Sequence, residues 1–325
     1  SIPIWMTWTV FVVACTISMF TMIFMLKWLE VAKSTIQITT YASYQGMVEH
    51  VIVPYFRKRG IKLVDLKATD LQDFYNKQLE RVKANSVIHY HANIHKALKY
   101  AVKIDLIPTN PADKVERPKK NEFKGSYYSA DEIHALTEVA EGTKLEIPVL
   151  LASFYGLRRS EVLGIQWRSI DFSVGTIQIQ HTRVYQEVDD RKVSVGRDTM
   201  KQKASCRTLP MPEEIAAILQ EERRNRYGEE TPPPENYLCL NPEGEPIASN
   251  YLSQSFKQFL RDHGLREIRL HDLRHTCASL LIQRRTPLIE VQQWLGHSTL
   301  STTADLYAHL EYETKLASAQ TLKKI

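Results

Sequence analysis

The chain has 325 residues, of which 43% are hydrophobic and 24% charged, and it is long enough for two domains with cores of their own. Its four cysteines lie far apart and no P-loop or Gly-x-Gly-x-x-Gly motif occurs, which argues against a disulfide framework, a zinc site and nucleotide-driven chemistry. The net charge of +5 is modest, so the distribution of the charge along the chain is more informative.

The positive charge is concentrated in the first part of the chain. Residues 27–125 hold 18 Lys and Arg against 10 Asp and Glu, a net of +8, whereas residues 126–325 hold 24 against 27, a net of −3. This asymmetry is typical of a polyanion-binding module joined to a catalytic body. Charge alone is also compatible with a basic surface that contacts only solvent.

Residues 1–26 form an apolar segment without a single charge. Its length suffices for one transmembrane helix, and Lys27 stands where the positive-inside rule places a cytoplasmic flank. Such an anchor would leave the rest of the chain in the cytoplasm. A buried helix and a segment foreign to the protein are the alternatives, and a cleaved signal peptide is disfavoured because no basic region precedes the apolar run.

Residues 27–118 are expected to form a small helical DNA-binding domain, because their apolar residues recur at helical spacing. After a helix over 69–81, the clearest helix runs from about Ser86, its expected cap, to Ile104. The other face of this helix presents basic side chains that suit a phosphate backbone. These candidate DNA-binding residues are His91, His95, Lys96, Lys99 and Lys103.

Two alternatives remain open for this basic face. It could simply be solvated. His91 and His95 also have the i,i+4 spacing of metal ligands, but no Glu follows the first His as in His-Glu-x-x-His, so no metal is expected there.

Residues 119–125 are polar and basic, and we expect a linker that lets two globular parts close around a duplex. The second domain then spans 126–325. Ser129 and Glu132 form a capping box that opens helices over roughly 130–141 and 145–155.

The segment from Thr176 to Pro210 has the alternation of strands, which predicts a small β-sheet or hairpin in a mainly α chain. Residues 176–180 are expected to form one strand, with 193–195 as its possible partner. A basic turn follows at 197–203, and residues 207–210 then resume the alternating pattern. Further helices are expected over 212–227, from Ser249 as cap to about 263, and from Thr286-Pro287 to a closing glycine at Gly296.

Four polar residues in the helical stretch 270–310 are suited to phosphodiester chemistry without a metal: His271, Arg274, His297 and Tyr307. Together they supply a cation for a phosphate, proton-transfer groups and a phenol that can attack. A phenol with a pKa near ~10 attacks poorly until a base or cations assist it. Each residue alone is more often structural, as a lone helical Tyr usually is, so the hypothesis depends on the combination.

Other parts of the chain complete this set. Arg158 lies at a glycine-loosened helix junction from which its planar guanidinium can reach a cleft and bind two phosphate oxygens. Lys201 and Lys203 both lie in the basic turn, where a lysine could give a proton to the leaving 5′-oxygen.

The order of these residues resembles the tyrosine recombinases of the phage integrase family, most of all the integrases of conjugative transposons. Five family motifs match: Tyr-Gly-Leu-Arg-x-Ser-Glu at 155–161, Lys-x-Lys-x-Ser-x-Arg-x-x-Pro at 201–210, His-x-x-Arg at 271–274, Leu-Gly-His at 295–297 and Tyr-x-His at 307–309. The resemblance covers about 27–325. It implies a helical, SAM-like core-binding domain followed by an α+β catalytic domain.

The resemblance also implies a role for each residue. Tyr307 would attack the scissile phosphate and form a 3′-phosphotyrosyl bond, while Arg158 and Arg274 stabilise the charge on the phosphate. Lys201, preferred over Lys203, would be the general acid. His271 would assist proton transfer from the tyrosine, His297 would hydrogen-bond the phosphate, and Glu161 would support the site from behind.

The implied partners are double-stranded DNA at core sites, a homotetramer exchanging strands through a four-way junction, and an accessory excision factor. No cofactor or metal is implied, and the protein is expected on DNA in the cytoplasm. Residues 1–26 stand where many such integrases have an arm-site domain, so arm-site binding is not expected. The alternatives are a type IB topoisomerase and a membrane-tethered DNA-binding protein with a dormant site.

Overall fold

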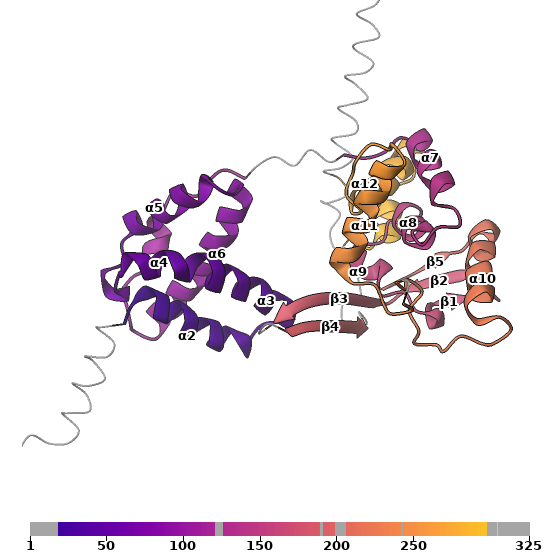
Figure 1. Ribbon diagram of the computed structural model, residues 1–325. Coiled ribbons are helices and arrows are strands. Elements are labelled where there is room, and N and C mark those ends of the chain that lie inside the picture. The colour runs from indigo at the N-terminus through magenta and orange to yellow at the C-terminus, as the bar shows by residue number, and fades with distance from the viewer. Residues whose placement is uncertain are drawn as a thin grey trace, which may run out of the picture. The chain divides into compact units, whose positions relative to one another are not determined.

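A computed structural model describes residues 19–120, 126–188, 191–198, 206–241, 243–297 and 304. The chain divides into two compact units, one built chiefly from the residues before Lys124 and the other chiefly from those after it (Figure 1). Helices dominate both units, and the strands described belong to two small antiparallel groups. The expected fold class is therefore confirmed.

The first unit is a helical bundle around one apolar core. The clearest helix, α6, buries Val87, Ile94, Leu98 and Ala101 almost completely, as its 3.6-residue periodicity predicts. Burying each such large apolar side chain contributes roughly 1.5–3 kcal/mol to stability. The α-helices of the first unit are α2 (Thr21–Lys33), α3 (Ile38–Met47), α4 (Val53–Arg59), α5 (Ala68–Leu79) and α6 (Ala84–Lys103), with a short π-helix η1 (Val48–Ile52) and short 3₁₀ helices η2 (Leu63–Asp65) and η3 (Pro111–Lys114).

Helix α2 continues through Lys27, where the composition changes. Phe24 and Met25 on one side of Lys27, and Trp28 and Leu29 on the other, are buried in the same core. Residues 21–26 thus belong to a helix that buries one face in this core, while Ile23 and Lys27 are exposed. Within the described ranges, no helix combines the length and apolar character that crossing a membrane requires. Residues 1–18 lie outside the described part of the chain.

Two expectations for α6 are wrong. The helix begins at Ala84, so Ser86 lies inside its first turn and does not cap it. His91 is buried at 7% exposure, and its Nδ1 lies 3.0 Å from the Tyr75 hydroxyl. The reason is periodicity, because His91 falls four residues after Val87 and three before Ile94, on the core stripe. Lys96, Lys99 and Lys103 are exposed, whereas half-buried His95 pairs with Asp113 at 2.8 Å.

The second unit packs helices around a short sheet. The capping box of Ser129 and Glu132 starts α7, and Gly296, with φ of 67°, ends α13 in the left-handed conformation, both as expected. Ser249 does not cap α11, because it is the first residue of that helix. The α-helices are α7 (Ala130–Ala140), α8 (Glu146–Ser153), α9 (Arg159–Val162), α10 (Glu213–Tyr227), α11 (Ser249–Asp262), α12 (Asp272–Gln283) and α13 (Leu288–Leu295), with a short 3₁₀ helix η4 (Trp167–Ser169).

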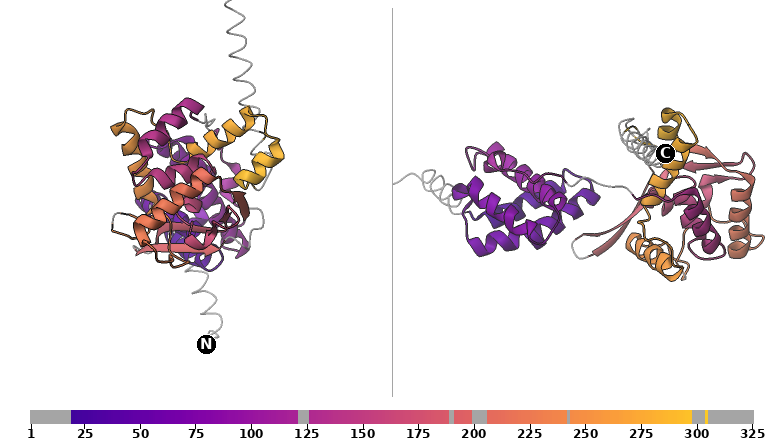
Figure 2. Two further views of the ribbon diagram at one scale, coloured as in Figure 1. Left: turned by 90° about the vertical axis from the view of Figure 1, so that its right-hand side faces the viewer. Right: turned by 90° about the horizontal axis from the view of Figure 1, so that it is seen from above.

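The sheet of the second unit has the order β1-β2-β5, and a separate hairpin joins β3 to β4. Ile177 of β2 pairs with Leu209 of β5, and both pack with Ile215 and Leu219 of α10, which lies along the sheet (Figures 1 and 2). The strands are β1 (Ile170–Asp171), β2 (Thr176–Ile179), β3 (His181–Val188), β4 (Arg191–Asp198) and β5 (Arg207–Pro210).

The expected partner of β2 was therefore wrong. Residues 193–195 lie in β4, which pairs with β3 instead. Only two residues separate β3 from β4, so their pairing closes a short local loop and leaves β2 to pair with the more distant β5.

Candidate active site

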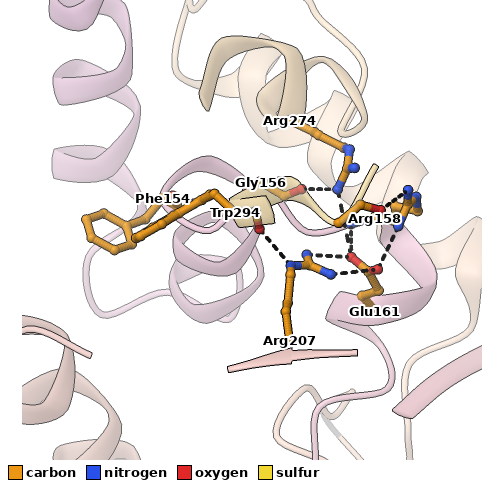
Figure 3. Close-up of polar contacts among 8 residues, drawn as sticks. Phe154, Gly156, Arg158, Glu161, Arg207, Arg274 and Trp294 are labelled. Carbon is orange, nitrogen blue, oxygen red and sulfur yellow. Dashed lines mark hydrogen bonds and ion pairs between the residues drawn. The ribbon is translucent and has the colours of Figure 1, made fainter. Parts of the chain in front are cut away.

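Three arginines surround one buried carboxylate in the second unit (Figure 3). The carboxylate is Glu161 of α9, whose side chain is 3% exposed. Arg158 stands just before α9, Arg207 comes from β5, and Arg274 comes from α12. Segments far apart in the sequence thus meet at one acidic residue.

The turn before α9 positions Arg158. Gly156 has φ of +62°, and a Cβ there would lie 2.4 Å from the Leu295 side chain, so only glycine fits this turn. Arg158 then takes the position before the helix, and its backbone N–H donates to Glu161 Oε2 at 2.9 Å. Its Nη1 donates to Oε1 of the same carboxylate, also at 2.9 Å. The short helix therefore fixes this ion pair locally.

Arg207 and Arg158 both reach the end of α13. Arg207 donates from Nε to the Trp294 carbonyl at 2.7 Å, and Arg158 donates from Nη2 to the Gly296 carbonyl at 2.9 Å. The last carbonyls of a helix have no partner within the helix and carry partial negative charge, so guanidinium groups stabilise them. Arg207 also donates to both oxygens of Glu161, at 3.3 and 3.2 Å.

Arg274 is the most deeply placed of the three arginines. It is 3% exposed, and its Nη1 donates to the Gly156 carbonyl at 2.6 Å and lies 3.9 Å from Glu161 Oε2. Its Nη2 is buried and has no hydrogen-bond partner within the described residues. Leaving a buried donor unpaired costs about 1–3 kcal/mol. Burial, together with the nearby charge of Arg158, lowers the pKa of Arg274 to about 9, which still leaves it cationic at neutral pH.

The cluster carries more positive than negative charge. Burial alone would raise the pKa of Glu161, but Arg207 and Arg158 outweigh it and bring that pKa below its ordinary value. Glu161 is therefore ionised and compensates one of three cations. Two excess positive charges at a buried site favour an anion.

Two histidines stand beside the arginines. His297 directly follows Gly296 and is half-buried, and desolvation with the charges of Arg274 and Arg158 lowers its pKa to about 4. His271 directly precedes α12. Desolvation, His275 and Arg274 lower its pKa to about 4 as well, although His271 is an exposed residue. Both imidazoles are therefore neutral at pH 7 and can each donate and accept a hydrogen bond.

His271 also lines an open cleft of about 940 Å³. Arg159, Lys257 and Arg269 line the same cleft, and Arg159 donates to the Ser253 hydroxyl at 2.9 Å. The lining also contains apolar side chains and the carboxylates of Glu267 and Asp272, which pair with Lys257 and Arg269.

The structure brings together several of the residues chosen from the sequence. Arg158, Glu161 and Arg274 lie in one cluster, His297 adjoins it, and His271 lies at the neighbouring cleft. Lys201, Lys203 and Tyr307 lie outside the described residues. The candidate DNA-binding residues on α6 belong to the other unit.

Arg207 is the site residue that the sequence analysis missed. It was assigned to a strand, yet it is the arginine of the Lys-x-Lys-x-Ser-x-Arg-x-x-Pro motif. The available signal was that Arg207 lies two residues before Leu209 and therefore shares its face of the strand. Within the described residues, no group of three or more His, Cys, Asp or Glu side chains could hold a metal ion.

Comparison with known proteins connects this geometry to a family. The model of the phage integrase family matches residues 127–314, and that of the phage integrase N-terminal SAM-like domain matches residues 23–79. The tyrosine recombinase XerC-like protein of Caldanaerobacter subterraneus subsp. tengcongensis is 30% identical over 319 residues, covering 92% of this chain and 81% of that protein. The ICEBs1 integrase of Bacillus subtilis is 27% identical over 289 residues, covering 83% and 73%.

A solved structure shows the same fold. The Tn1549 transposon integrase in complex with a circular intermediate DNA superimposes with a TM-score of 0.75 at 17% identity, covering 94% of this chain and 100% of that one. The chain therefore belongs to the phage integrase family, similar to the integrases of conjugative transposons, and it is a tyrosine recombinase, an enzyme that cuts and rejoins DNA at specific sites.

Proposed function

We propose that this recombinase integrates and excises a mobile element, cutting each strand through a 3′-phosphotyrosyl bond to Tyr307. The observation that carries the proposal is the arginine cluster around Glu161, with the buried, unpartnered Nη2 of Arg274. A phosphodiester bound there would supply the missing acceptor. It would also take up the excess positive charge of the cluster.

Arg158 and Arg274 are the arginines that we assign to the phosphate. Arg274 has a donor to spare, and the Arg158 side chain is 35% exposed although it contacts Glu161 and Gly296. Both would stabilise the charge that develops on the non-bridging oxygens. Removing one such donor typically costs about 2.7–4 kcal/mol of transition-state stabilisation.

Proton transfer completes the reaction. The Tyr307 oxygen forms a bond to phosphorus while the bond from phosphorus to the 5′-oxygen breaks. His271, neutral at pH 7, accepts the phenolic proton, and Lys201 gives a proton to the leaving 5′-oxygen. His297 donates a hydrogen bond to the phosphate, and Glu161 holds the arginines. Attack by a second 5′-hydroxyl reverses the step, so the energy of the linkage is kept without ATP.

The first unit binds the duplex through the exposed face of α6. Lys96, Lys99 and Lys103 are exposed on one helix and offer point charges for phosphates. His91 takes no part, because it is buried against Tyr75. His95 is a weaker candidate, because Asp113 already pairs with it.

The assembly follows from the chemistry of strand exchange. Each duplex is cut on both strands, so two duplexes need four copies of the enzyme working through a four-way junction. An accessory excision factor would select the direction of the reaction. The DNA places this activity in the cytoplasm, and a membrane anchor would have to come from residues outside the described ranges.

A nicked crossover site tests the proposal directly. The nick lets the short fragment that carries the freed 5′-hydroxyl diffuse away, so a covalent complex accumulates and its peptide can be mapped. We expect the adduct at Tyr307, and we expect Tyr307→Phe to bind the site as tightly as the wild type while forming no adduct. An adduct in that variant would assign the nucleophile to another residue.

A supercoiled plasmid without any crossover site is the control for specificity. A site-specific recombinase leaves it supercoiled. Rapid relaxation of that plasmid would instead identify a topoisomerase.

A further inference from the structure

We propose that Arg207 is a positioning residue for strand cleavage, which holds the His297 turn and the Arg158–Glu161 pair in register and makes no contact with DNA. This inference rests on the proposed function, because it concerns the same site. Arg207 differs from Arg158 and Arg274 because its N–H donors bond protein groups and are not assigned to the phosphate.

Each nitrogen of the Arg207 guanidinium donates a hydrogen bond to a protein group. Nε donates to the Trp294 carbonyl, and the two terminal nitrogens donate to the two oxygens of Glu161. The side chain is 7% exposed, so little of it could reach a phosphate. A planar fork bonded on two sides fixes the distance and the angle between its partners. Those partners are the carboxylate of α9 and the last turn of α13.

The turn that carries His297 lies against this guanidinium. A Cβ on Gly296 would stand 2.7 Å from Arg207 Nη1, and Gly296 has φ of +67°. The close approach therefore requires glycine at this position. From the other side, His297 N–H donates to the Gln292 carbonyl and the Gln292 side chain donates to the His297 carbonyl, each at 3.1 Å. The backbone of His297 is thus held by Gln292 of α13, and Arg207 of β5 binds the last turn of the same helix at Trp294.

The same contacts reach the phosphate ligands. Arg207 and Arg158 both donate hydrogen bonds to the carboxylate of Glu161, and Arg158 also donates one to the carbonyl of Gly296. Moving Arg207 would therefore shift Arg158 through Glu161 and His297 through Trp294 and Gly296. A displacement of about 1 Å in a catalytic group can cost on the order of 100-fold in rate.

Single-turnover cleavage of a nicked crossover site by the full-length protein tests this assignment. The variants are Arg207→Lys, which keeps the charge without the fork, and Arg207→Gln, which removes the charge. Arg224→Gln is the charge-matched control, because Arg224 is exposed on α10. The amplitude of the cleavage reaction measures the fraction of enzyme that is folded. The rate constant measures how fast that folded fraction cleaves, and it therefore depends on the geometry of the site.

We expect both Arg207 variants to bind DNA within about 3-fold of the wild type and to cleave it with rate constants lower by about 10–100-fold. On a logarithmic scale, the cleavage rate constant of Arg207→Lys should lie closer to that of Arg207→Gln than to that of the wild type. Arg207→Gln combined with Glu161→Gln should cleave little more slowly than Glu161→Gln alone, because the two residues act as one unit. Arg224→Gln should match the wild type.

Three results would overturn the inference. A normal rate constant with a reduced amplitude would make Arg207 merely structural. Full activity of Arg207→Lys would mean that charge alone suffices, and a Kd raised tenfold or more would place Arg207 on the DNA. Failure of the proposed function is recognised separately, since the wild type itself would then form no adduct at Tyr307.

Discussion

The two units use positive charge in opposite ways. Around Glu161, Arg158, Arg207 and Arg274 converge on one buried carboxylate, and the buried Nη2 of Arg274 has no hydrogen-bond partner within the described residues. On α6, Lys96, Lys99 and Lys103 stand exposed along a helix. Lys96 lies over the Tyr44 ring, 5.1 Å from its centroid, and hydrogen-bonds the Tyr44 hydroxyl.

The difference shows how burial determines the effect of a positive charge on a bound phosphate. A buried cation is desolvated at a cost of several kcal/mol, so it persists only with fixed partners, and its effect on a bound phosphate is then strong and sensitive to geometry. An exposed cation is screened by water and salt, so it attracts a backbone additively and without precise placement. The comparison predicts large, coupled effects in the second unit and small, additive effects in the first.

Removing the shared carboxylate should break the cluster most severely. Glu161→Gln leaves three guanidinium groups near one another without compensation, and we expect the free energy of unfolding to fall by about 3–5 kcal/mol. Urea unfolding at pH 7 measures it. Glu267→Gln is the matched control, because Glu267 pairs with exposed Arg261 at 2.8 Å and an exposed pair is typically worth about 0–1 kcal/mol. Equal losses in the two variants would contradict a special role for burial.

Removing the unpartnered donor should affect the reaction more than the fold. Arg274→Gln is expected to lower the single-turnover cleavage rate by about 10²–10³-fold, because a donor aimed at the phosphate is lost. Arg284→Gln changes an exposed residue that ends the same helix, and it should cleave like the wild type. A cleavage rate of Arg274→Gln within threefold of the wild type would remove Arg274 from the phosphate site.

Neutralising the α6 lysines should weaken binding in a salt-dependent way. For Lys96, Lys99 and Lys103 changed together to Gln, we expect about 10–100-fold weaker DNA binding at 0.1 M salt, and the slope of log Kd against log salt should decrease by up to about 2.7. Titration by fluorescence anisotropy at several salt concentrations measures both.

A second triple variant separates the effect of where the charges lie from the effect of how many charges are removed. Lys144, Arg224 and Arg284 are exposed residues of the second unit, and changing them to Gln removes the same three charges. That variant should retain most of the slope. If both triple variants lost it equally, net charge and not the α6 face would govern binding.

Local patterns in the sequence predicted local structure well. The stripe of α6, the capping box at Ser129 and the closing Gly296 were confirmed, because each depends on neighbours in the chain. The same periodicity, applied to His91, would have placed it in the core with Val87 and Ile94. Serine alone did not define a helix start, since neither Ser86 nor Ser249 caps its helix.

Long-range partners were harder to predict. The pairing of β2 with β5 depends on which strand is left after β3 and β4 close locally, and alternation alone does not contain that information. Arg158, Glu161 and Arg274 were chosen from motifs and lie in one cluster, whereas Arg207 was missed because its role exists only when β5, α9 and α13 meet. Roles that depend on Tyr307 and Lys201 remain predictions.

The neutral histidine of the cluster gives the smallest and most diagnostic effect. The pKa of His297 is about 4 in the folded protein, against an ordinary value of 6.5. Below pH 6.5 the unfolded chain therefore binds a proton that the folded chain does not, so stability from this residue is complete above about pH 7 and is lost as the pH falls toward 4. Between pH 7 and pH 5 we expect the wild type to lose about 1–2 kcal/mol more than His297→Gln, measured by urea unfolding.

Exposed His134 on α7 provides the control, and His134→Gln should keep the wild-type pH dependence. If His297→Gln lost as much stability as the wild type on acidification, His297 would not be desolvated beside the arginines. A short duplex bound at the site extends the test, because phosphate opposes the charge of Arg274 and Arg158 and should raise the pKa of His297. Bound DNA should therefore reduce the acid sensitivity of the wild type and leave that of His297→Gln unchanged, an outcome that an exposed basic face such as α6 could not produce.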